Sequence, residues 1–271
     1  MKTNTIITIG RQYGSAGRQI GRVLAEELGI KCYDKELLER AAKESGLCEE
    51  LFENHDEKPT NSFLYSLVMD TYSFGYTSSA FSDMPINQKV FLAQFETIKK
   101  IAAEGPCIMI GRCADYALAD FDNCFSVFFH ADLQTRIRRI AKIYDLTDAK
   151  AIDRIIKTDK KRSSYYNYYT SKRWGDADSY DLCIDSGKMG VDGSVELMLN
   201  AIQLKEKGYK FFMDSDTNQQ FIIVKDTKLQ EIRQKYGVTY QQRYDETHSV
   251  IRLCTSWATK EENVKAFLQD M

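Results

Sequence analysis

A run of apolar, mostly β-branched residues near the start of the chain leads into a glycine-rich loop and then into a helical pattern. Residues 5–9 read Thr-Ile-Ile-Thr-Ile, the loop carries Gly10, Gly14 and Gly17, and apolar residues recur at helical spacing from Ile20 to Leu28. Glycines let the backbone approach an anion closely, and the N–H groups at a helix start point toward it. The sequence therefore predicts either a phosphate cradle or an ordinary glycine-rich turn between strand and helix.

The loop departs from the common phosphate-binding pattern G-x-x-x-x-G-K-[ST]. Laid over residues 12–19, the pattern finds its second glycine at Gly17, whereas Gln12 replaces the first glycine, Arg18 the lysine and Gln19 the hydroxyl residue. Arginine still binds phosphate, and does so with two parallel hydrogen bonds. We therefore expect a nucleotide polyphosphate on this loop. The expected binding residues are Gly14, Ser15, Ala16, Gly17, Arg18 and Gln19.

Composition argues against several classes of protein. The 271 residues are 43% hydrophobic, which is enough for one large domain or two smaller ones. The net charge of −2 gives no basic field that would favour nucleic acid. No apolar run is long enough to span a membrane, and the first residues do not resemble a signal peptide. The seven scattered cysteines, without a C-x-x-C motif, favour buried thiols in a reducing cytoplasm over disulfides or structural zinc.

Strand-like and helix-like runs alternate over residues 1–207. Residues 30–33, 107–110, 124–129 and 180–184 are typical of strands, and residues 35–45, 88–103 and 193–207 are typical of helices. This alternation predicts an α/β fold with a doubly wound parallel sheet and helices on both faces. Residues 63–84, rich in Ser, Tyr and Phe, give no clear assignment.

Charged residues follow the predicted strands, at the edge where parallel sheets bind ligands. Asp34 follows the second strand, and Arg112 and Asp115 follow the third. Asp34 has two interpretations, a helix cap or a ligand contact. The helix after the fourth strand carries Arg136, Arg138 and Arg139. At least one of these three arginines is expected to lie on a solvated helix face.

A basic, tyrosine-rich segment precedes the fifth strand. It contains Asp159, Lys160 and Arg162, followed by four tyrosines within residues 165–169. The tyrosines fit either a packing surface or a self-association patch, as in a homodimer.

These motifs, in this order, resemble those of the cytidylate kinase-like proteins, a branch of the P-loop nucleoside monophosphate kinases. The resemblance covers about residues 4–205. It rests on R-Q-Y-G-S-A-G-R at 11–18, C-Y-D-K-E-L at 32–37, I-G-R at 110–112, R-S-S-Y-Y-N-Y-Y at 162–169, W-G at 174–175 and Y-D-L at 180–182. The fold that it implies is P-loop NTPase-like.

The resemblance also implies an activity, the transfer of a phosphoryl group from ATP with Mg²⁺ to a nucleoside monophosphate such as CMP or dCMP. Asp34, Arg112 and Asp115 would contact the acceptor, although Cys113 stands where the family has the aspartate of Gly-Arg-Asp. A lid over about residues 154–176, with Asp159, Lys160 and Arg162, would close over the phosphates. The expected catalytic residues are Arg18, Arg112, Arg136, Arg139 and Arg162. The altered loop favours an alternative, a nucleotide-binding regulatory protein that has lost efficient transfer.

From about residue 208 the alternation stops, and a small α+β segment is expected over residues 208–271. Strands are expected at 211–213, 221–224 and 250–254, and helices at 228–236 and after a capping box at 259–262. Residues 214–221 and 245–259 resemble the C-terminal end of low-specificity threonine aldolases, in which Arg252 would grip an amino-acid carboxylate. The PLP-binding domain of those enzymes has no room here, so no PLP is expected. We expect a fused appendage that packs on the first domain or on a second copy.

Overall fold

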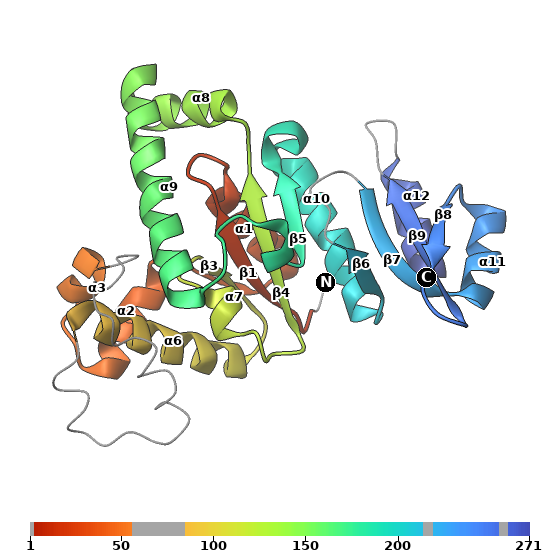
Figure 1. Ribbon diagram of the computed structural model, residues 1–271, viewed down its shortest axis with the longest axis horizontal. Helices are drawn as coiled ribbons and strands as arrows, with labels where there is room; N and C mark the ends of the chain where they lie inside the picture. Colours follow the sequence, from red (N-terminus) through yellow and green to blue (C-terminus); the bar gives the residue numbers. More distant parts are fainter. Residues whose placement is uncertain (1–2, 56–84, 214–218, 255–259) are drawn as a thin grey trace.

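The computed structural model describes residues 3–55, 85–213, 219–254 and 260–271 (Figure 1). Its larger part is built on one parallel sheet with the strand order β2-β3-β1-β4-β5. The strands are β1 (Ile6–Arg11), β2 (Lys31–Tyr33), β3 (Cys107–Ile110), β4 (Cys124–His130) and β5 (Leu182–Asp185). At the centre, Ile7 of β1 pairs with Ile108 of β3 and with Phe125 of β4. The predicted parallel sheet is confirmed.

Helices cover both faces of this sheet. One apolar cluster joins the sheet to α1 and α10, and a second joins it to α6 and α7. These helices are α1 (Gly17–Leu28), α6 (Ile86–Glu104), α7 (Ala114–Ala117) and α10 (Ser186–Glu206). Every residue of β3 is buried, because both faces of the strand are covered, and this explains its unbroken apolar sequence. The doubly wound α/β fold expected from the sequence is confirmed.

The remaining helices of this unit pack in two places. The helices α2 (Glu36–Ser45) and α3 (Glu49–His55) pack with α6, and α8 (Leu133–Tyr144) packs on the long helix α9 (Asp148–Thr170). Within the described residues, no helix has the length and apolar composition needed to cross a membrane. Residues 63–84, which gave no assignment from the sequence, lie outside the described part of the chain.

The tyrosines near the end of α9 form a packing surface inside the molecule. Tyr165, Tyr166 and Tyr169 are buried, and the ring of Tyr169 stacks on Phe91 of α6 with centroids 3.8 Å apart. The hydroxyl of Tyr165 donates to Oε1 of Gln94 at 3.1 Å. Tyr165 and Tyr169 therefore anchor α9 on α6, whereas the hydroxyl of Tyr166 donates to Asp115 of α7. The burial of all three leaves them no part in a self-association patch.

The structure decides between the two interpretations of Asp34 and extends the last helix of this unit. Asp34 does not cap α2, because the N-cap position is Lys35 and the Asp34 carboxylate pairs with Arg18 instead. The last helix of this unit begins at Ser186 rather than at residue 193, because the Asp185 side chain accepts hydrogen bonds from the N–H groups of residues 187 and 188. Gly190 (φ 71°, ψ −176°) is non-helical and kinks α10, and the helix expected from residue 193 lies after this kink.

A four-stranded antiparallel sheet follows, in the order β6-β7-β9-β8. Its elements are β6 (Lys210–Met213), β7 (Gln219–Lys225), α11 (Asp226–Lys235), β8 (Thr239–Arg243), β9 (His248–Cys254) and α12 (Glu261–Asp270). Leu204 of α10 joins the apolar core of this unit, and the hydroxyl of Tyr209 donates to the carbonyl of Met271 at 2.5 Å. The small α+β segment is confirmed, and the boundary at residues 207/208 stays a prediction. Thr259, the first residue of the predicted capping box, lies outside the described residues.

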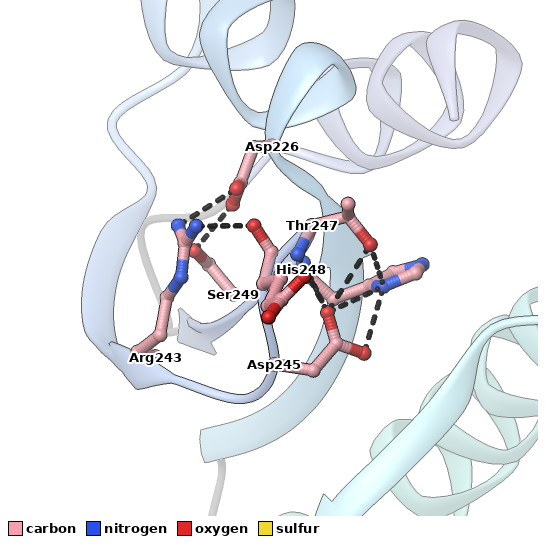
Figure 2. A network of polar contacts seen from close by, with 7 residues as sticks. Asp226, Arg243, Asp245, Thr247, His248 and Ser249 are labelled. Atoms are coloured by element: carbon pink, nitrogen blue, oxygen red, sulfur yellow. Dashed lines mark hydrogen bonds and ion pairs between the residues drawn. The ribbon is translucent and has the colours of Figure 1, made fainter.

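A polar network closes the hairpin between β8 and β9 (Figure 2). Asp226 accepts hydrogen bonds from Arg243 at 2.7 Å and from Ser249 at 2.6 Å, which ties the start of α11 to both strands. Asp245 accepts from the N–H groups of Thr247 and His248 at 2.7 and 2.8 Å. The backbone hydrogen bond from Thr247 is the main cause that lowers the pKa of Asp245 to about 2. Local turn chemistry thus accounts for these residues.

The burial of the thiols gives a testable expectation for cysteine reactivity. Cys48 and Cys254 are exposed, whereas burial raises the pKa of Cys32 to about 11 and that of Cys107 to about 12. Because the thiolate is the reactive form, a thiol-specific disulfide reagent at about pH 8 should label Cys48 and Cys254 quickly and the other cysteines only after denaturation. Mass spectrometry of the labelled protein identifies the sites. Rapid labelling of Cys107 in the folded protein would contradict this expectation.

Candidate functional site

The loop after β1 is tied to the ends of the neighbouring strands. The N–H of Gln12 donates to the carbonyl of Phe129 in β4 at 3.0 Å, and Gln12 Oε1 accepts from the N–H of Ala131 at 3.2 Å. The hydroxyl of Ser15 donates back to the Gln12 carbonyl at 2.9 Å. Gln12, which replaces a glycine of the common pattern, therefore fixes the loop to β4.

The backbone of this loop contains two residues with positive φ. Gly14 has φ 84° and Ala16 has φ 65°, and both values lie in the left-handed region. Ala16 occupies the N-cap position of α1 and offers no side-chain oxygen to the first N–H groups of that helix. Alternation of backbone hand next to a helix start is the geometry of an anion-binding nest. The loop thus has the shape expected of a phosphate cradle.

Arg18, Asp34 and Arg112 form one ion-pair cluster at the carboxyl ends of β2 and β3. Nε of Arg18 lies 2.7 Å from Oδ2 of Asp34, and Nη1 of Arg112 lies 3.6 Å from Oδ1 of the same carboxylate. Arg18 is half exposed, whereas the side chains of Asp34 and Arg112 are buried. The structure therefore joins Arg18, predicted to bind the donor nucleotide, to Asp34, and Asp34 in turn pairs with Arg112; both of these were predicted to bind the acceptor.

The backbone after β3 is unusual. Gly111, Arg112 and Cys113 have φ values of 76°, 57° and 56°, so three successive residues are left-handed. For a residue with a Cβ this conformation costs about 1–2 kcal/mol. A Cβ at Gly111 would also collide with the buried guanidinium of Arg11. Strain of this kind is concentrated at functional sites, and here it turns Arg112 back onto the carbonyl of Ile110 at 3.2 Å.

Arginines from α8 and α9 reach the carbonyl groups of the β1 strand end and its loop. Nη1 of Arg139 donates to the Gly14 carbonyl at 3.4 Å and Nη2 to the Ser186 carbonyl at 3.1 Å. Nη1 of Arg162 donates to the Arg11 carbonyl at 3.2 Å. Burial lowers the pKa of Arg139 from its ordinary value. Positive charge from two helices is therefore held against the loop, where a polyphosphate would need it.

A carboxylate from α9 lies on the same loop. Oδ1 of Asp159 accepts from the N–H of Tyr13 at 2.7 Å, and Oδ2 pairs with Nη1 of Arg136 at 2.5 Å. Arg136 also lies 3.5 Å from the Tyr13 carbonyl. The Asp159 carboxylate thus contacts one loop N–H and one arginine, which are the groups that an incoming phosphate would use.

Ser186, which the sequence analysis missed, links the loop to two strand ends. Its Oγ lies 2.5 Å from the carbonyl oxygen of Ser15 and 2.9 Å from that of His130, and the single hydroxyl proton is shared between them. Ser186 is fully buried at the first position of α10. Its place directly after the fifth strand is the signal that could have identified it.

Asp115 and Arg112 line one small cavity beside α9. Its volume of about 20 Å³ is enough for one or two water molecules. The hydroxyl of Tyr166 donates to Oδ2 of Asp115 at 2.6 Å, and burial raises the pKa of Asp115 above its ordinary value. The same cavity is lined by Arg11 and Arg162. Two predicted acceptor-binding residues therefore share one polar space.

Other predicted site residues lie toward solvent. Gln19 and Lys160 are exposed. Arg138, which was not among the predicted site residues, is exposed too, and its Nη2 donates to the hydroxyl of Thr135 at 3.0 Å; it is the arginine of this helix that was expected on a solvated face. In the described part of the chain, no group of three or more His, Cys, Asp or Glu side chains is arranged to hold a metal ion. The roles of the predicted site residues stay predictions.

Comparison with known proteins gives a consistent result for the first unit. The model of the cytidylate kinase-like family matches residues 6–188. A cytidylate kinase from Archaeoglobus fulgidus is 26% identical over 206 residues, covering 74% of this chain and 96% of that protein. The crystal structure of an uncharacterized protein from Eubacterium ventriosum is similar with a TM-score of 0.55 and 28% identity, over 73% of this chain and 98% of the other.

One further solved structure concerns the predicted resemblance to threonine aldolases. A threonine aldolase from Leishmania major is 15% identical, with a TM-score of 0.28, over 57% of this chain and 53% of the other. This similarity is too low to carry an argument. The resemblance of residues 208–271 to threonine aldolases, and the role that it implied for Arg252, therefore stay predictions.

Proposed function

Because the chain belongs to the cytidylate kinase-like family, we propose that it is a phosphotransferase that uses ATP to phosphorylate a nucleoside monophosphate, with CMP or dCMP as acceptor. The observation that carries the proposal is the cluster of Arg18, Asp34 and Arg112, which joins the start of α1 to the ends of β2 and β3. This cluster borders a loop shaped for an anion, so donor and acceptor phosphates would meet beside it.

The reaction asks little covalent chemistry of the protein. An oxygen of the acceptor phosphate attacks the γ-phosphorus of ATP, the bond between that phosphorus and the bridging oxygen breaks, and ADP leaves. The protein aligns the two nucleotides, spreads positive charge over the transferred group and excludes water. The N–H groups of Gly14, Ala16 and Gly17 would hold the donor phosphates, and Arg136, Arg139 and Arg162 would neutralise their charge.

The residues of the loop fit the phosphates of ATP better than they fit a metal ion. The left-handed backbone at Gly14 and Ala16 provides N–H donors, whereas Gln19 stands where the common pattern has a hydroxyl ligand. Mg²⁺ would neutralise charge on the transferred phosphates, and it is bound mainly through substrate phosphates and waters in many kinases. We therefore propose that ATP enters as its magnesium complex.

The acceptor is tested by a coupled ADP-release assay with ATP, Mg²⁺ and a panel of nucleoside monophosphates. We expect release that depends on CMP or dCMP and exceeds the release with AMP, GMP and UMP. Equal release with all acceptors would contradict the specificity, and no release with any acceptor would contradict the activity.

One observation favours a second candidate, a nucleotide-binding regulatory protein without efficient transfer. The positive charge of Arg18, at the position of the usual lysine, is paired with Asp34 in this structure. ATP binding measured by calorimetry without any ADP release would support that candidate. We also propose a cytoplasmic location, since the seven cysteines are scattered without a C-x-x-C motif, as is usual in a reducing compartment.

A further inference from the structure

A cavity of about 460 Å³ lies between α10 and the antiparallel C-terminal sheet, away from the loop after β1. Figure 1 shows α10 running beside this sheet. The helix begins directly after β5 of the first unit. The apolar wall has residues from both units. They are Leu197, Ala201 and Leu204 of α10 and Val264, Phe267 and Leu268 of α12. Volumes of about 300–1,000 Å³ with mostly apolar walls are typical of small-molecule sites, and these sites often lie between domains.

Two residues that line this cavity, Gln220 and Arg252, each have a buried side-chain nitrogen without a hydrogen-bond partner. Gln220 of β7 is 6% exposed, and its Nε2 atom is buried without a hydrogen-bond partner. Gln220 lies on the same face of the sheet as Ile222, which belongs to the core of the C-terminal unit, so its side chain faces inward. A buried amide without a partner is destabilising, and natural proteins tolerate few of them. A ligand oxygen in the cavity would satisfy this donor.

We propose that this cavity is a binding site for an apolar small molecule that carries a hydrogen-bond acceptor oxygen, such as a ketone, an ester or an amide. The apolar body lies between α10 and α12, and the oxygen accepts from Nε2 of Gln220. Such a ligand bridges the two units, because both units contribute residues to the walls of the cavity. The site is separate from the proposed nucleotide site, and its existence does not depend on phosphotransfer.

Benzophenone and diphenylmethane form a matched pair of probes, since they share two rings and differ in the carbonyl oxygen. Isothermal calorimetry of the full chain should show saturable binding of both, with benzophenone about tenfold tighter because of one hydrogen bond to a buried donor. Irradiated benzophenone also inserts into nearby C–H bonds. Peptide mapping should place the crosslinks in residues 197–204 and 264–268.

Two variants, each with a matched control variant, test the polar contact and the apolar wall separately. Gln220→Leu should bring the affinities for the two probes close together, whereas Gln242→Leu, at an exposed position of the same sheet, should leave their ratio unchanged. Asn200→Trp places a large ring at the cavity wall and should abolish crosslinking, whereas Glu196→Trp, exposed one turn earlier on α10, should not. If Gln220→Leu does not fold, as judged by circular dichroism, the tryptophan pair decides.

Several results would overturn the proposal. They are the absence of saturable binding within the solubility of benzophenone, crosslinks that map outside α10 and α12, and crosslinking that persists in Asn200→Trp. An unchanged preference for benzophenone in folded Gln220→Leu would overturn the assignment of the donor. None of these results bears on ADP release, so failure here is distinct from failure of the proposed phosphotransfer.

Discussion

Replacing Arg112 with alanine is expected to lower kcat/KM for phosphoryl transfer by at least about 100-fold, the usual effect of removing one preorganised donor from a charged transition state. The side chain of Arg112 is 4% exposed and is held by a left-handed backbone between the Asp34 carboxylate and the Ile110 carbonyl. A guanidinium fixed in this way needs little reorganisation when negative charge develops beside it. The coupled ADP-release assay, run over a range of acceptor concentrations, measures the loss.

Two further variants make the Arg112 result specific. Arg112→Lys keeps the charge but loses the planar pair of donors, so it should recover only part of the activity. Arg138→Ala removes an exposed arginine that contacts Thr135 on α8, and it should keep the activity of the parent protein. ATP affinity and thermal unfolding are recorded for each variant, since loss of Arg112 also removes a partner of the buried Asp34. Full activity in folded Arg112→Ala would refute its proposed role.

The parallel sheet could be predicted because its strands are short apolar runs that alternate with helical patterns. Residues 107–110 are apolar without interruption and turn out to be buried on both faces, and the glycines after β1 mark the strand-to-helix turn. The C-terminal unit was harder to predict. All residues of β8 (Thr239–Arg243) are exposed, so this edge strand lacks the apolar alternation that would reveal it. Polar edge strands are specified by their neighbours rather than by their own pattern.

The candidate site was only partly predictable. The position of Arg112 after β3 identified it, because the strand end is a property of the sequence. The pairing of Arg18 with Asp34 could not be predicted, since it depends on how close α1 and the end of β2 lie in space. The contacts of Ser186 with the carbonyl groups of Ser15 and His130 could not be predicted for the same reason, although its position after the fifth strand could. Sequence patterns locate residues along the chain, whereas ion pairs and shared hydrogen bonds follow from the register of the assembled sheet.

Replacing Asp159 with asparagine is expected to tighten ATP binding by about tenfold, although the change removes a contact of the ligand-free protein. The Asp159 carboxylate accepts from the Tyr13 N–H and pairs with Arg136, so ATP must displace it before a phosphate can use these two groups. A hydrogen bond with a charged partner contributes about 1.5–3 kcal/mol, and the neutral amide keeps only part of it. Isothermal calorimetry with ATP measures the change in affinity.

The matched control is Asp153→Asn, on the same helix, where the carboxylate pairs with Lys157 and is 61% exposed. It should change ATP affinity little, because an exposed ion pair within one helix contributes only about 0.3–0.5 kcal/mol. This carboxylate pairs with a lysine of its own helix and not with the loop. Asp159→Asn should also lower the melting temperature without ligand, since the docking of α9 on the loop loses a charged contact. Weaker ATP binding in Asp159→Asn would contradict displacement of the carboxylate by phosphate, because it would mean that the carboxylate assists the bound state.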